Sequence, residues 1–110
     1  MIQAHPISGA IGAEISGVDL SEHISDETIT EIRQALLNHQ VIFFRDQDIT
    51  PDQQRAFGAR FGLLDIHPFI EPLDGYPEIL VVKKEPEDTY NLGNTWHADA
   101  TFYEEPPLGS

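Results

Sequence analysis

His97 and Asp99, separated by one residue, are the side chains of this sequence with the clearest potential for chemistry. If the residues around them are extended, both side chains point to the same side of a strand, because strand side chains alternate between faces. An imidazole nitrogen and a carboxylate oxygen could then reach one metal ion. Such a pair supplies two of the three ligands of the 2-His-1-carboxylate triad, which holds non-haem Fe(II) and leaves coordination positions open.

The pattern around this pair predicts a strand but leaves two interpretations open. Trp96, Ala98, Ala100 and Phe102 alternate with polar residues, which is typical of a strand with one apolar and one polar face. The tryptophan is then expected in the core. The same pattern also fits a half-buried strand on which the histidine and the aspartate are simply exposed to solvent. About 0.4 such pairs are expected by chance in 110 residues, so the motif by itself is weak.

Composition narrows the class of protein. The 110 residues, 40% of them hydrophobic, are typical of one small globular domain. The absence of cysteine excludes disulfides, thiolate zinc sites and cysteine nucleophiles. A net charge of −13 disfavours nucleic acid and anionic membrane surfaces as partners. We see neither a secretory signal nor a long apolar run, and therefore expect a cytoplasmic protein.

Two helices are predicted in the first half of the chain. Ser25 is a suitable N-cap for an amphipathic helix over about residues 26–38. The run 50–53 combines an N-cap threonine, a proline at the first helical position and a capping-box glutamine. This run predicts a second helix that extends to about Phe61 and is ended by Gly62.

Apolar runs predict strands at residues 11–15, 41–44 and 79–82, the last two buried on both faces. Strands mixed with two helices, without regular βαβ alternation, indicate an α+β arrangement. Strands buried on both faces need neighbours on both sides, and this chain offers few. We therefore infer that the sequence is the first part of a larger domain.

Several motifs, in the same order along the chain, resemble the N-terminal part of the taurine dioxygenase family of Fe(II)- and 2-oxoglutarate-dependent oxygenases. They are the runs 11–20, 41–47, 50–54, 61–62, 67–68 and 94–107. Together they are far more specific than one His-x-Asp pair. The resemblance implies a mainly β fold, a double-stranded β-helix (jelly roll) with N-terminal helices. This fold would be incomplete here, since residues 1–110 would form only the N-terminal portion of a single dioxygenase domain.

The resemblance also implies a metal and two co-substrates. His97 and Asp99 would be two ligands of Fe(II), and 2-oxoglutarate and O2 would be the co-substrates. The third ligand, a histidine, and the arginine that pairs with 2-oxoglutarate are expected beyond Ser110. Residues 1–110 alone are expected to be inactive, and the complete enzyme could be a homo-oligomer.

The same resemblance also implies which residues contact the substrate. His67 matches a position that binds an anionic head group, and Asn94 matches a polar substrate contact. Ala100 and Phe102 match positions that line the substrate pocket. From the residues alone, His67 is better interpreted as a solvated or capping loop histidine, and Phe102 fits a core aromatic equally well. In an ideal strand Phe102 would also face away from His97.

Two departures from the family pattern bear on the substrate. Ile70 replaces a tyrosine and Gly93 replaces an aspartate, and both family residues help to hold the ammonium group of taurine. An amine needs acceptors or a counter-charge, so taurine is a doubtful substrate. We expect a small anionic substrate, such as an alkyl sulfonate or a sulfate ester, without an amine.

Two other kinds of function stay open. One is a non-catalytic, truncated remnant that turns nothing over. The other is a jelly-roll metal protein with a different activity, such as an isomerase. Oxygen consumption that depends on 2-oxoglutarate would distinguish the dioxygenase from both.

Overall fold

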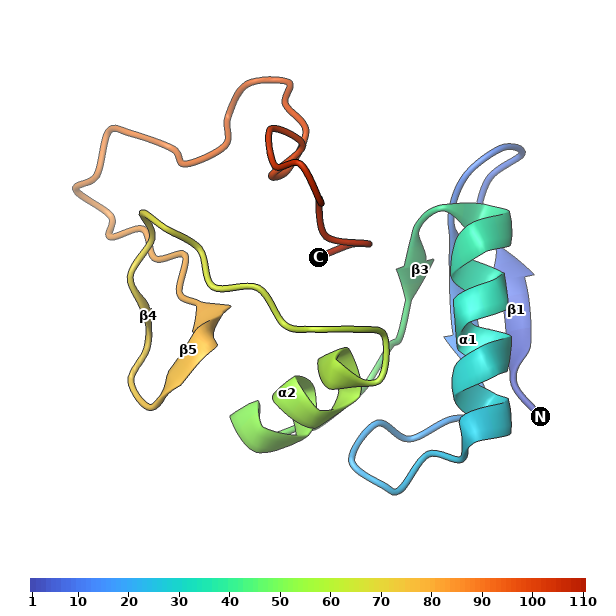
Figure 1. Ribbon diagram of the computed structural model, residues 1–110. Helices are drawn as coiled ribbons and strands as arrows, with labels where there is room; N and C mark the ends of the chain where they lie inside the picture. Colours follow the sequence, from blue (N-terminus) through green and yellow to red (C-terminus); the bar gives the residue numbers. More distant parts are fainter. The chain divides into compact units, whose positions relative to one another are not determined.

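The computed structural model describes all residues from Met1 to Ser110, which separate into two compact units, Met1–Phe61 and Gly62–Ser110. The elements of the first unit are β1 (Gln3–Pro6), β2 (Ala13–Ser16), α1 (Asp26–His39), β3 (Ile42–Phe43) and α2 (Pro51–Ala59) (Figure 1). Those of the second unit are β4 (Pro72–Leu73) and β5 (Tyr76–Leu80). Helices and short strands are mixed, as the sequence predicts. Neither helix has the length and apolar character that crossing a membrane would require.

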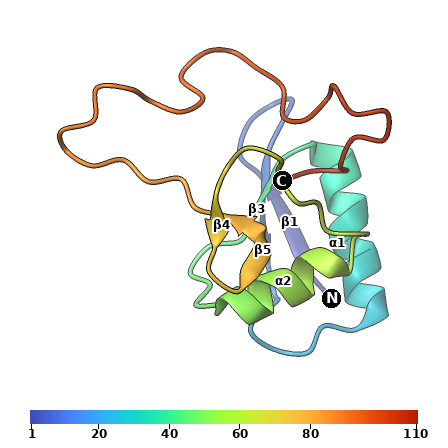
Figure 2. The same ribbon diagram turned by 60° about the vertical axis from the view of Figure 1, so that its left-hand side comes forward.

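The first unit is built on a three-stranded sheet in the order β1-β2-β3. β1 pairs antiparallel with β2, and β3 pairs parallel with β2, with Ala13 opposite Ile42. A parallel pair needs a crossover connection, and α1 supplies it, running alongside the sheet in both views (Figure 1, Figure 2). The strand predicted over residues 41–44 is confirmed in type, but it is shorter and only half-buried. β1 was not predicted.

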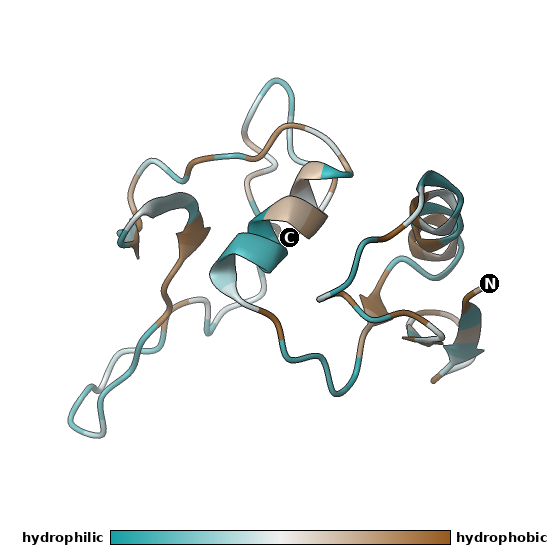
Figure 3. Ribbon diagram, turned by 90° about the horizontal axis from the view of Figure 1, so that it is seen from below, coloured by the Kyte–Doolittle hydropathy of each residue, from teal (hydrophilic) through white to brown (hydrophobic).

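α1 confirms the predicted helix to within one residue at its C-terminal end. The Ser25 hydroxyl accepts the backbone N–H of Thr28, which caps the first turn. Ile29, Ile32 and Ala35 recur at helical spacing and are buried. Figure 3 shows this helix nearly end-on, with hydrophobic colour on the side toward the strands and hydrophilic colour on the opposite side.

α2 begins at the predicted capping box. The Thr50 side chain accepts the backbone N–H of Gln53, and the Gln53 side chain accepts the N–H of Thr50. The helix ends at Ala59, two residues before the predicted end. Phe57 packs edge-on against Phe44, with ring centroids 5.7 Å apart, and so joins α2 to the cluster of Leu20, Ile24 and Ile29.

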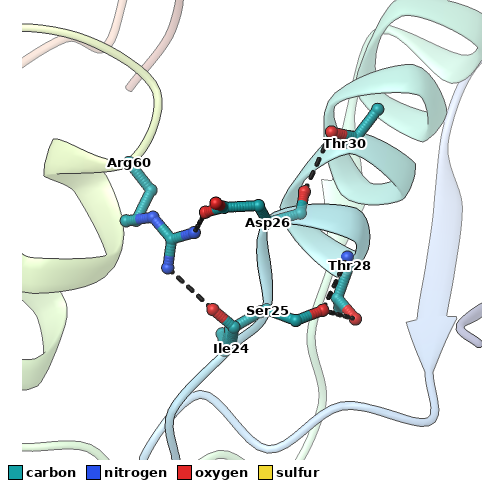
Figure 4. A network of polar contacts seen from close by, with 6 residues as sticks. All are labelled: Ile24, Ser25, Asp26, Thr28, Thr30 and Arg60. Atoms are coloured by element: carbon teal, nitrogen blue, oxygen red, sulfur yellow. Dashed lines mark hydrogen bonds and ion pairs between the residues drawn. The ribbon is translucent and has the colours of Figure 1, made fainter.

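A guanidinium group ties the end of α2 to the start of α1. Arg60 donates one hydrogen bond to the carbonyl oxygen of Ile24, at 2.8 Å, and another to the carboxylate of Asp26 (Figure 4). Thr30 donates to the carbonyl of Asp26, one turn further along α1. The first unit therefore has polar ties at its surface as well as an apolar core.

The second unit has no buried residue of its own. All seven buried hydrophobic side chains of the chain lie in Met1–Phe61. β4 and β5 form an antiparallel hairpin around Gly75, and no helix or strand follows β5 (Figure 2). The prediction of a strand buried on both faces over residues 79–82 is wrong in part: β5 stops at Leu80, and Val82 is 68% exposed. Gly62–Ser110 has no third strand or helix that could cover this hairpin.

Replacing Ile32 with alanine should lower the free energy of unfolding of the first unit by about 2–5 kcal/mol, because it leaves a cavity at a site closed to water. Leu37→Ala is the matched control, since Leu37 lies on the same helix and is 55% exposed. Its effect should stay within about 0.5 kcal/mol. Urea titration followed by circular dichroism measures both, and equal losses would contradict the buried face assigned to α1.

Candidate metal site

His97 and Asp99 do not lie on a strand. Residues 94–110 form turns and bends, so the strand predicted from their alternation is wrong. Ala100 has a positive φ of 51°, which an extended strand does not allow, and its carbonyl accepts the N–H of Tyr103 in a turn. Trp96, expected in the core, is fully exposed. An alternating pattern becomes a strand only where a neighbouring strand pairs with its backbone, and Gly62–Ser110 supplies none here.

The turns nevertheless bring the two side chains together. The Nε2 atom of His97 lies 3.2 Å from the Oδ1 atom of Asp99, and the two side chains are 51% and 65% exposed. Two ligands in adjacent octahedral positions, each about 2.1 Å from a metal ion, lie about 3.0 Å from each other. The separation therefore fits a shared metal ion, reached through a turn rather than through strand geometry.

The hydrogen bonding of His97 also fits a cation. Its Nδ1 atom lies 2.6 Å from the carbonyl oxygen of Thr95, which can only accept, so Nδ1 carries the proton. In the neutral ring Nε2 then keeps its lone pair and faces a carboxylate oxygen. A proton or a metal cation must offset the repulsion between two such atoms. A histidine that donates its other N–H to a backbone carbonyl is the usual arrangement for a metal ligand.

Gly93 leaves room for the imidazole ring of His97, because it has no side chain. Its φ is +71°, and a Cβ atom built on it would lie 3.2 Å from Cε1 of the His97 ring. A side chain at this position would strain the backbone and crowd the ring. The sequence singled out this glycine only as a departure from the family pattern. Its closeness to the candidate ligand is a feature that the sequence alone did not reveal.

The structure brings no third ligand to this pair. No group of three or more His, Cys, Asp or Glu side chains is arranged to hold a metal ion. His5 lies on β1 with its Nε2 atom 2.9 Å from the hydroxyl of Ser16 on β2. His97 and Asp99 are thus the pair that this chain offers.

His67 caps its own turn, one of the two interpretations that the sequence left open. Its Nδ1 atom accepts the backbone N–H groups of Phe69 and Ile70, each at 3.1 Å. Its ring lies edge-on to that of Phe69, with centroids 5.9 Å apart. Nε2 has no protein partner, so it is free for a ligand.

The other predicted substrate residues make no polar contact with the candidate metal pair. Asn94 is exposed and Ala100 is half-buried. Phe102 is 72% exposed rather than in a core, and its ring packs against that of Tyr103, with centroids 4.6 Å apart.

An open depression of about 510 Å³ in the second unit lies against Asp65, Ile66, Tyr103, Glu104 and Glu105. The sequence did not single out these residues. Three carboxylates repel an anionic head group, so this depression does not fit the expected substrate.

A histidine beside a carboxylate forms part of the ligand set of the non-haem iron enzymes. Residues 3–110 match the family described as "Taurine catabolism dioxygenase TauD, TfdA family". The chain belongs to this family, as its motifs indicate.

Individual relatives agree with this assignment. An alpha-ketoglutarate-dependent sulfate ester dioxygenase of Pseudomonas putida is 38% identical over 110 residues, covering 99% of this chain and 36% of its own length. An alkylsulfatase of Acinetobacter baylyi is 36% identical, covering 96% of this chain and 33% of its own length. The crystal structure of a taurine dioxygenase from Burkholderia xenovorans superimposes with a TM-score of 0.64 at 44% identity, covering 69% of this chain and 28% of that one. The chain thus spans about a third of the length of the relatives that it matches.

Manganese(II), added to the 110-residue chain, should broaden the NMR signals of His97 and Asp99 first, because an imidazole nitrogen and a carboxylate oxygen lie 3.2 Å apart there. Binding should be weak, since two ligands leave most of the coordination sphere to water. His97→Ala should abolish the selective broadening, whereas His23→Ala, a change of an exposed histidine in the first unit, should leave it intact. Tight stoichiometric binding, or broadening that persists without His97, would contradict the site.

Proposed function

We propose that this chain is the N-terminal portion of an Fe(II)- and 2-oxoglutarate-dependent dioxygenase that hydroxylates a small anionic organic molecule. The observation that carries the proposal is the pair His97 and Asp99, with Nε2 and Oδ1 3.2 Å apart, in a chain that matches the family over residues 3–110. The complete domain would be a jelly roll, of which this chain contributes the first part.

His97 and Asp99 would hold the iron, and the chain's own contribution is to keep them in place. Thr95 orients the His97 ring through its carbonyl, and Gly93 leaves room for that ring. Bound iron, with 2-oxoglutarate and O2, supplies the oxidising power that hydroxylates a C–H bond. The third ligand and the arginine for 2-oxoglutarate would come from polypeptide outside residues 1–110.

The substrate that we propose is an alkyl sulfate ester or an alkyl sulfonate. His67 would bind its anionic head group, Asn94 would make a polar contact, and Ala100 and Phe102 would line the pocket for its alkyl part. Hydroxylation of the carbon next to the heteroatom gives an unstable product that releases sulfate or sulfite. The names of two relatives, a sulfate ester dioxygenase and an alkylsulfatase, support this substrate class.

The activity is tested by O2 consumption in the full-length protein with Fe(II), 2-oxoglutarate and an alkyl sulfate. We expect uptake that requires 2-oxoglutarate and falls at least about 100-fold in His97→Ala and Asp99→Ala, because each variant removes an iron ligand. His23→Ala should retain the activity. Failure of every alkyl sulfate and sulfonate to support uptake would favour the non-catalytic remnant or the metal protein of another activity.

Substrate choice gives an independent test. The ratio kcat/KM for taurine should be at least about tenfold lower than for an alkyl sulfate of similar length, because Ile70 and Gly93 offer no acceptor for an ammonium group. The measurement is the succinate formed with each substrate in competition. Better turnover of taurine would show that the amine is bound by other groups.

A further inference from the structure

Backbone hydrogen bonds place the proton of the neutral His67 ring on Nε2, whereas they place that of His97 on Nδ1. Amide N–H groups can only donate, so the Nδ1 atom of His67, which accepts from Phe69 and Ile70 at 3.1 Å each, must carry its lone pair. The proton of the neutral ring then lies on Nε2. In His97 the Thr95 carbonyl holds the proton on Nδ1, and Nε2 faces the Oδ1 atom of Asp99.

We propose that the turn from His67 to Ile70 locks the tautomer of His67 and makes its Nε2–H a dedicated hydrogen-bond donor to an anionic oxygen. The backbone amides of Phe69 and Ile70 are then positioning groups that act through the imidazole. The identity of the acceptor, a sulfate or sulfonate oxygen, rests on the proposed function, whereas the lock itself does not.

Three features of the turn indicate that the Nε2–H group of His67 points in a fixed direction. Pro68 has no N–H, so the next two amides along the chain are the ones that meet Nδ1. The Phe69 ring lies edge-on to the imidazole, with an interplanar angle of 71°, and limits its rotation. The outer nitrogen, Nε2, has no protein partner.

The lock separates the roles of the two histidines. Because Nδ1 of His67 is already occupied and its Nε2 carries a proton, His67 is a poor ligand for a cation. The Nε2 atom of His97 faces the carboxylate of Asp99, so it is not turned toward an external anion. An alkyl sulfate has acceptor oxygens for the Nε2–H of His67, whereas an ammonium group has none.

Long-range proton–nitrogen NMR spectra of the ¹⁵N-labelled 110-residue chain, in alkaline buffer where imidazoles are neutral, report the tautomer of each histidine. His67→Asn and His97→Asn assign the two rings by loss of their signals. We expect a pure Nε2–H pattern for His67 and a pure Nδ1–H pattern for His97. A pattern for His67 that is averaged between tautomers, or of the Nδ1–H type, would overturn the lock.

Two substitutions at one position test the amide directly. Ile70→Pro removes an amide that donates to Nδ1 and should give His67 a mixture of tautomers, while Ile70→Val keeps the amide and should leave the pattern unchanged. Unchanged shifts of β4 and β5 show that the hairpin is intact in both variants. If the pattern of the proline variant stays pure, the Ile70 amide is not a positioning group.

Methyl sulfate and methylammonium serve as probes of the donor role. Methyl sulfate should shift the Nε2–H resonance of His67, and methylammonium should not. No shift with methyl sulfate, or equal shifts with both, would overturn the donor role. A confirmed lock in a full-length protein without 2-oxoglutarate-dependent turnover would contradict only the proposed function.

Discussion

Burial of one stripe of α1 against a three-stranded sheet is the interaction on which the folded first unit depends. Ile32, wholly closed to water, lies in that stripe, and Ala13 is equally closed on the central strand β2. The same helix is the crossover that makes parallel pairing of β2 with β3 sterically feasible. One hydrophobic contact therefore determines both the core and the topology. The Arg60 ties and the capping box of α2 add to a structure that this contact already defines.

The second unit is organised by a different kind of force. It buries no side chain, so the positions of its functional groups depend on short-range hydrogen bonds between a ring nitrogen and the nearby backbone. His97 is held from two residues away, and His67 from two and three residues away. Local bonds of this kind set the direction and protonation of a ring even where no core surrounds it. They do not by themselves bring distant side chains into one pocket.

What the sequence could predict follows the same division. The helix starts at Ser25 and Thr50 were predictable because a cap is formed by residues three apart in the chain. The candidate metal pair was proposed from its residue types, and its geometry comes from a turn and not from a strand. Burial of Trp96 and Val82 was predicted wrongly, since burial needs partners far along the chain that residues 1–110 lack. Neither tautomer could be inferred from sequence, because both depend on which backbone group meets a ring.

The conformation of Gly93 has a consequence for how this protein could evolve. An acidic residue at this position would be the shortest mutational route toward substrates that carry an amine. Here such a residue would have to adopt a φ of +71° and would press on the ring of a candidate iron ligand. A single mutation at this position would therefore act on the ring of the candidate ligand as well as on any group that the new side chain contacts.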